Sequence, residues 1–104
     1  LNASEQTNMN ESNREKLARY LKALGHPVRV RIMELLCAEG ECLTGDLSSR
    51  LPVAASTTSQ HLSILREAGL ICGTIDGPRR CYCINEQALD EAKRLLAGLS
   101  QRCC

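Results

Sequence analysis

The stretch PVAASTTSQHLSILREAGL, residues 52–70, predicts a turn followed by a short helix and a helix stop. Ser56 stands where an N-cap residue belongs, because its side-chain oxygen can accept a hydrogen bond from a free N–H of the first turn. Leu62 and Leu65 recur at helical spacing and give the helix an apolar face. Gly69 supplies the kind of residue that commonly ends a helix.

The other side of this helix carries short polar side chains, where a merely solvated helix would more often carry Lys and Glu. Gln can pair bidentately with adenine, Ser and Thr can bond to several bases, and a Thr methyl can touch thymine. The predicted DNA-contacting residues of the helix are Ser56, Thr57, Thr58, Gln60, His61 and Ser63. The alternative is a first turn rich in cap-forming residues, which are favoured there without any DNA.

The segment before the turn completes a helix-turn-helix unit. Residues 44–51 are predicted to form a short helix capped by Thr44, with Asp46 in the first turn, where the helix dipole favours an anion. Two helices joined by a turn of three or four residues form the unit whose second helix enters the major groove.

Two short strands are predicted next, at residues 71–75 and 80–84, joined by a tight turn. They would form a wing beside the helix-turn-helix unit. Arg79 and Arg80 at its tip are predicted to reach phosphate or the minor groove, and a solvated turn is the alternative.

The chain resembles the ArsR family of bacterial winged-helix repressors in the run GDLSSRLPVAASTTSQHLSILREAGLICG. The resemblance extends back to LKALGHPVRVRIMELL and forward to GPRRCYCI, so it covers most of the chain. Members of this family respond to metals, metalloids or thiol chemistry, and they read two operator half-sites as dimers. The resemblance implies a mainly α fold with a small β-hairpin, a winged helix-turn-helix of about five helices.

Residues 1–12 are polar and lack periodicity, so we predict a disordered N-terminal tail. Residues 13–104 are predicted to form one winged helix-turn-helix domain that ends in a C-terminal dimerisation helix. The first and last helices keep apolar faces that the DNA-reading unit does not use, and we expect a homodimer through them. These apolar residues are Leu17, Tyr20, Leu21, Leu24, Leu89, Ala92, Leu95, Leu96 and Leu99.

Composition narrows the functional classes. The 104 residues suffice for one domain, and a formal net charge of +1 gives no general attraction to nucleic acid. DNA binding must therefore rest on groove-facing side chains and a few local arginines. No apolar run is long enough to cross a membrane and no signal peptide is present, which predicts a cytoplasmic protein. Seven cysteines in such a protein favour thiol or metal chemistry over a disulfide framework.

Cys103 and Cys104 are adjacent at the C-terminus, where an exposed thiol is open to oxidation and needs a reason to be present. Adjacent cysteines close a disulfide poorly, but both sulfurs can bind one large thiophilic centre such as trivalent arsenic or antimony. A methylated trivalent arsenical needs two thiolates, whereas arsenite prefers three. A chance tail composition is the alternative.

Other cysteines are candidates for a third ligand. In the family, two cysteines one residue apart followed by an aspartate form a soft-metal site, and here only Cys42 of that pair is present. Cys72, Cys81 and Cys83 share the outer face of the predicted wing, and Cys72 is expected opposite Cys83. Small residues on a half-exposed strand are the alternative. Cys37 is expected to be a small buried hydrophobe.

Zinc, nickel and cobalt sensors of the family place His with Asp or Glu on the last helix. Here that helix has Asp90 and Glu91 but no His, which disfavours a site for those metals.

These observations predict a homodimeric repressor, with no constitutive cofactor, that releases operator DNA on binding trivalent arsenic or antimony. A thiol or persulfide sensor of the same fold, switching through Cys72 and Cys83, is the nearest alternative. A thiol enzyme is disfavoured because the chain lacks a C-x-x-C motif and an anion-cradling loop beside a cysteine. A winged helix used only for protein contacts is the remaining alternative.

Overall fold

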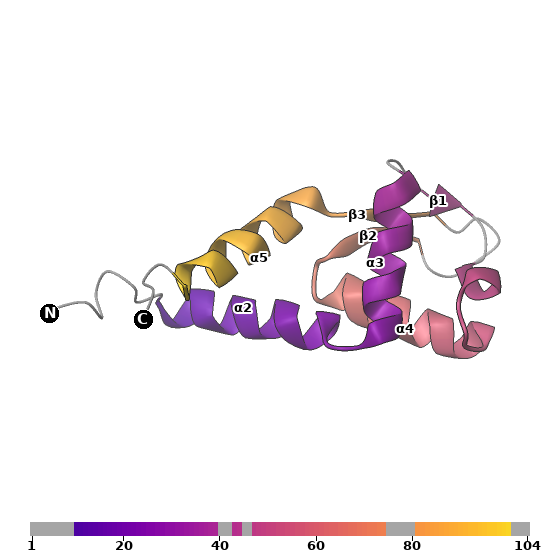
Figure 1. Cartoon of the computed structure of the whole chain (residues 1–104), viewed down its shortest axis with the longest axis horizontal. Coiled ribbons are helices and arrows are strands. Elements are labelled where there is room, and N and C mark those ends of the chain that lie inside the picture. The colour runs from indigo at the N-terminus through magenta and orange to yellow at the C-terminus, as the bar shows by residue number, and fades with distance from the viewer. Residues whose placement is uncertain (1–9, 40–42, 45–46, 75–80, 101–104) are drawn as a thin grey trace, which may run out of the picture.

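The computed structural model describes residues 10–39, 43–44, 47–74 and 81–100. Figure 1 shows two regions: α2 and α5 lie side by side at one end, and the remaining helices surround a small sheet at the other. No helix in the described part of the chain is long and apolar enough to cross a membrane. In chain order the elements are α2 (Glu11–Leu24), α3 (Pro27–Glu39), β1 (Leu43–Thr44), the 3-10 helix η1 (Leu47–Arg50), α4 (Ala55–Glu67), β2 (Ile71–Thr74), β3 (Cys81–Ile84) and α5 (Glu86–Gly98).

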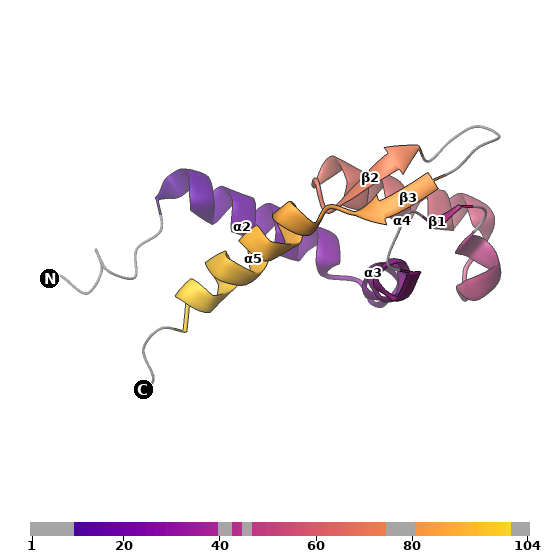
Figure 2. The same cartoon turned by 90° about the horizontal axis from the view of Figure 1, so that it is seen from above.

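The sheet has the order β1-β3-β2, and both pairings are antiparallel. The predicted register of the wing is confirmed, because Cys72 lies opposite Cys83. Tyr82 points into the core and is 1% exposed, whereas Cys72 is on the exposed outer face. Figure 2 shows the β2–β3 hairpin beside α4, as expected for a wing.

The segment before α4 differs from its prediction. Thr44 does not cap a helix; it lies in β1, opposite Cys81 of the hairpin. The helical part is shorter than predicted and is the single 3-10 helix η1, with Leu47 buried in the core. Leu43 and Thr44 instead find backbone partners in β3, a long-range contact that local sequence does not reveal.

The core forms where α3, α4 and the sheet meet. Its residues are apolar and belong to elements far apart in sequence, so they fix α4 against the rest of the domain. The largest side chains that are fully buried are those of Ile32, Leu47, Leu62, Leu65, Leu70 and Tyr82.

Both ends of α4 can be assigned. The N-cap is Ala54, which makes no side-chain capping bond, so the prediction of an N-cap at Ser56 is wrong by two residues. At the other end Gly69 has φ +87°, and the N–H of Leu70 donates to the Leu65 carbonyl at 3.0 Å. This is the predicted glycine stop in its Schellman form.

α2 and α5 are joined by a polar cluster around Glu91. The Tyr20 hydroxyl donates to Glu91 at 2.7 Å, and the Lys16 ammonium lies 3.2 Å from the same carboxylate. These hydrogen bonds, the one from Tyr20 first, lower the pKa of Glu91. α2 begins at Glu11 with Asn10 as its N-cap, so residues 10–12 do not belong to a disordered tail, and the rest of that prediction lies outside the described residues.

The apolar faces predicted for dimerisation are only partly covered within one chain. Leu17, Tyr20 and Leu95 are buried between α2 and the elements that pack on it. Leu21 on α2, Leu96 on α5 and Leu99, the C-cap residue of α5, remain exposed. A homodimer through this end of the domain stays a prediction.

Gly73 tests whether the wing requires a glycine. Its φ is +119°, and a Cβ built there overlaps the carbonyl oxygen of Cys81. We expect Gly73→Ala to lower the free energy of unfolding by more than about 1 kcal/mol, because the backbone conformation is incompatible with a side chain. Gly98→Ala is the matched control: its Cβ meets no atom within 4 Å, and Ala is the better helix former. Urea unfolding checks both, and equal stability of the two variants would contradict this account of the wing.

Candidate nucleic-acid interface

α4 presents a continuous polar face that the core does not cover. Ser56 and Gln60 are exposed and Ser63 is half-buried, and they recur at the four- and three-residue spacing of one helix face. Ser59 lies on the same face and was not predicted. Its position, three residues after Ser56 and four before Ser63, was the signal that would have included it. Thr57 is half-buried at the edge of the face.

Two predicted DNA-contacting residues belong to the core instead. Thr58 is 2% exposed, and its hydroxyl donates to the Ala54 carbonyl at 3.1 Å. His61 is 8% exposed, and its ring lies 4.5 Å from that of His26, measured between centroids. Both residues share the side of α4 that carries Leu62 and Leu65, so they cannot face base edges in this fold. The prediction for Thr58 and His61 is therefore wrong.

The chemistry of His61 agrees with this position. Burial lowers its pKa, and the nearby His26 and Arg29 lower it further by charge repulsion. Both effects favour the neutral imidazole, as suits a side chain on the buried face of α4.

The wing is tied to one flank of α4. The Arg66 guanidinium donates to the Gly73 carbonyl at 3.2 Å, so the last turn of the helix holds the strand that leads to the wing tip. The predicted phosphate contacts Arg79 and Arg80 lie outside the described residues. On the opposite flank, α4 faces α2 and the start of α3 across an open cavity.

The outer face of the wing carries a pair of thiols. The Sγ atoms of Cys72 and Cys83 are 3.2 Å apart, and both residues are accessible to solvent. The hydrogen bond to Cys83 raises the pKa of the Cys72 thiol, and burial adds to the effect. Cys81 on the same face is disulfide-bonded, whereas Cys37 is a free, exposed thiol and not the buried one predicted.

This thiol pair provides two sulfurs on the outer face of the wing. Among the residues that the structure describes, no three His, Cys, Asp or Glu side chains converge on a point where a metal ion would bind. Two sulfurs are the number that suits a methylated trivalent arsenical. Cys42, Cys103 and Cys104 lie outside the described residues, so the predicted ligand set stays a prediction.

Known proteins that resemble this chain are bacterial transcriptional regulators. Residues 26–72 match a sequence profile described as "Bacterial regulatory protein, arsR family". The HTH-type transcriptional regulator YgaV of Escherichia coli K12 is 35% identical over 80 residues, covering 77% of this chain and 81% of that protein.

Two solved structures add fold-level similarity. A possible transcriptional regulator for arsenical resistance has a TM-score of 0.64 at 28% identity, covering 78% of this chain and 83% of that one. Reduced HlyU from Vibrio cholerae N16961 has a TM-score of 0.62 at 32% identity, covering 88% of this chain and 96% of that one.

Gln60→Ala tests the polar face of α4. A lost bidentate contact with a base costs about 1–3 kcal/mol, so the affinity for a specific site should fall by a factor of about 5 to 150. Binding to unrelated DNA should be unchanged, because phosphate contacts are not touched. Fluorescence anisotropy on promoter and scrambled duplexes checks this. Gln87→Ala on α5 is the control, since Gln87 is also exposed but lies on another helix. Equal losses from both variants would place the contact elsewhere.

Proposed function

Because the chain belongs to the arsR family of bacterial regulatory proteins, we propose that it represses transcription as a homodimer and releases its operator when trivalent arsenic or antimony binds to cysteine thiolates. The family and the relatives are helix-turn-helix transcriptional regulators and not enzymes, and this general function is the basis of the proposal. The observation that carries the proposal is the rigidly held α4 with its uncovered polar face of Ser56, Ser59, Gln60 and Ser63. A cytoplasmic location is part of the proposal.

The metalloid part of the proposal is supported by thiol placement. Cys103 and Cys104 follow α5, so a ligand held by them would act on the helix that packs against α2. Soft thiolates favour a thiophilic centre over hard cations. The similarity to a possible regulator for arsenical resistance points in the same direction.

An inducer must bind more tightly to a conformation with low DNA affinity, since otherwise it cannot cause release. The contacts of Glu91 with Tyr20 and Lys16 join α5 to α2 and offer a route for such coupling. If α2 and α5 also form the dimer interface, a shift of α5 would change the distance between the two recognition helices. A dimer reads half-sites at a fixed spacing, so such a change weakens binding.

A thiol-redox sensor is the second candidate, and the Cys72–Cys83 contact favours it. The two sulfurs are 3.2 Å apart on an exposed surface, and reduced HlyU is among the similar structures. A peroxide would oxidise the two thiols by two electrons: an S–S bond forms between the strands, the O–O bond breaks, and the two thiol protons leave in two molecules of water. A polysulfide would form the same disulfide while one of its own S–S bonds breaks, and its two fragments take up the thiol protons and leave as hydrosulfide and a shorter hydropolysulfide. The S–S separation would then shorten to about 2.05 Å.

Operator release distinguishes the two candidates. Arsenite, a methylated trivalent arsenical, antimonite and polysulfide are each titrated into the reduced protein bound to a labelled promoter fragment, and anisotropy is followed. We expect the arsenicals to release the wild type but not Cys103→Ser/Cys104→Ser, because that variant lacks both tail sulfurs. Cys37→Ser is the control, since Cys37 is a free exposed thiol on α3.

Other outcomes would change the assignment. Release by polysulfide alone, abolished in Cys72→Ser/Cys83→Ser and reversed by dithiothreitol, would replace the metalloid proposal with the redox one. Release by arsenicals in the tail variant but not in the wing variant would move the ligand site to Cys72 and Cys83. A wild type that binds no promoter sequence specifically would contradict repression itself.

A further inference from the structure

When α4 lies in a major groove, the width of the helix and the width of the groove determine how close the DNA phosphates come to its two flanks. A helix with its side chains is about 10–12 Å across, and the major groove of B-DNA is about 12 Å wide. A recognition helix that enters the groove therefore brings a row of phosphates close to each of its two flanks. On one flank of α4 stands the wing, held by the bond from Arg66 to Gly73.

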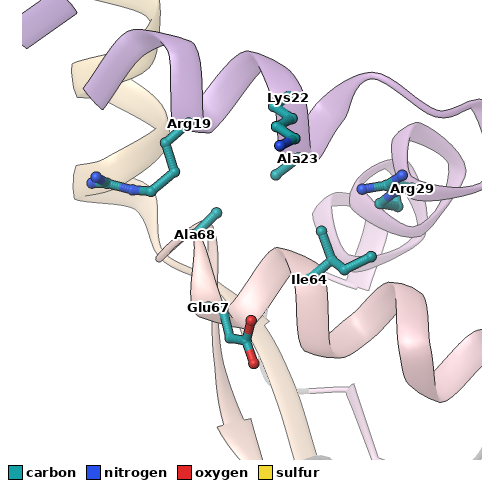
Figure 3. Close-up of a pocket in the computed structure, with 7 residues that line it drawn as sticks. All are labelled: Arg19, Lys22, Ala23, Arg29, Ile64, Glu67 and Ala68. Atoms are coloured by element: carbon teal, nitrogen blue, oxygen red, sulfur yellow. The ribbon is translucent and has the colours of Figure 1, made fainter. Parts of the chain in front are cut away.

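The other flank of α4 borders a cavity of about 510 Å³. Figure 3 shows cationic side chains from α2 and α3 along one rim and α4 along the facing rim. Three positive groups and one negative group line it, so an anion is favoured there. The residues that matter are Arg19 and Lys22 of α2, Arg29 of α3, and Ile64, Glu67 and Ala68 of α4.

Arg29 is the residue of this cavity that most clearly lacks a hydrogen-bond acceptor among the described residues. Its Nε is buried, and it forms no hydrogen bond within the described part of the chain. Buried polar groups are nearly always hydrogen-bonded, and a charged donor left without a partner is costly. A guanidinium donates in a planar fork that matches the oxygens of a phosphate.

Arg19 and Lys22 have room to join such a contact. Both are exposed residues in the last two turns of α2, which directly precede α3. Arg19 also lies over the Tyr20 ring, with 5.5 Å between its Cζ and the ring centroid. The cavity is therefore bordered by the half-buried Arg29 and by two exposed cations of α2.

The cavity lies next to the polar face of α4. Ile64 follows Gln60 by four residues, which is about 6 Å along the helix axis, and Glu67 follows Ser63 by the same spacing. A helix placed in the groove by Gln60 and Ser63 would bring the cavity to the phosphates at the groove's edge. The single carboxylate of Glu67 weakens the site without reversing its sign.

We propose that this cavity binds a backbone phosphate of the operator, so that α4 is held between the wing on one flank and a phosphate site built from Arg19, Lys22 and Arg29 on the other. The inference rests on the DNA-binding part of the proposed function and is independent of the inducer. It assigns to α2 a role in DNA binding besides its contacts with α5. A free phosphate ion has the same chemistry and is the other source that a test must distinguish.

The salt dependence of DNA binding tests the proposal. Each phosphate contact contributes about 0.9 to the slope of log K against log salt concentration. For a dimer with one site per protomer, Arg19→Gln/Lys22→Gln should lower the slope by about 1–2 and weaken binding roughly tenfold or more. The loss should be the same on promoter and scrambled DNA, because a phosphate carries no sequence information. Both residues are exposed, so the variant should fold, and circular dichroism checks that it does.

Two further variants sharpen the result. Arg29→Lys keeps the charge but removes the Nε donor, so it should keep most of the salt slope and still lose affinity. Lys93→Gln/Arg94→Gln on α5 removes the same charge from side chains that are 71% and 72% exposed. This control should leave the slope unchanged, since α5 does not border the cavity.

The outcomes separate this inference from the proposed function. A wild type that binds no promoter would remove the function and with it the inference. Specific wild-type binding combined with an unchanged slope in Arg19→Gln/Lys22→Gln would overturn the inference alone. Inorganic phosphate should not raise the wild-type melting temperature at millimolar concentration. If it did so in the wild type only, while the slope stayed unchanged, the cavity would be a site for a free anion.

Discussion

Leu62 and Leu65 anchor α4 in the core, and their burial sets which side of the helix faces outward. They pack among residues of α3 and the sheet, where Ile32 and Tyr82 are also fully buried. A helix fixed by two side chains three residues apart cannot rotate without exposing both of them. The polar face of Ser56, Ser59, Gln60 and Ser63 is therefore presented in one orientation. Burial of Thr58 and His61 follows from the same constraint, because they share the packed side.

The near-neutral charge of the chain gives this geometry more importance than it would have in a basic protein. A formal net charge of +1 supplies little general attraction to DNA, so local arrangement must concentrate what positive charge there is. Arg19, Lys22 and Arg29 do so beside α4, although they come from two different helices. The fold also brings two thiols together: Cys72 and Cys83 are eleven residues apart in sequence, but their Sγ atoms are 3.2 Å apart.

Patterns within single elements and across the short hairpin were predictable from the sequence. The stop at Gly69 and Leu70, the register that pairs Cys72 with Cys83, and the inward position of Tyr82 all follow from local spacing. β1 was not predictable, because its two residues are strand only through pairing with β3.

The site was predicted less completely than the fold. Thr58 and His61 are polar and were predicted to contact DNA, but both are buried in the core. Ser59 was not predicted to contact DNA, although its spacing places it on the polar face of α4. The cation cluster could not be found from sequence, since Arg19 and Arg29 are ordinary surface residues until α2 and α3 are placed around α4.

Hydroxyl-radical footprinting of the protein on its own promoter tests the central claim most directly, namely that a dimer places two copies of α4 in successive major grooves. The account predicts two protected regions with centres one helical turn apart, about 10–10.5 base pairs, or a whole multiple of that distance. A single protected region, or protection without regular spacing, would contradict it.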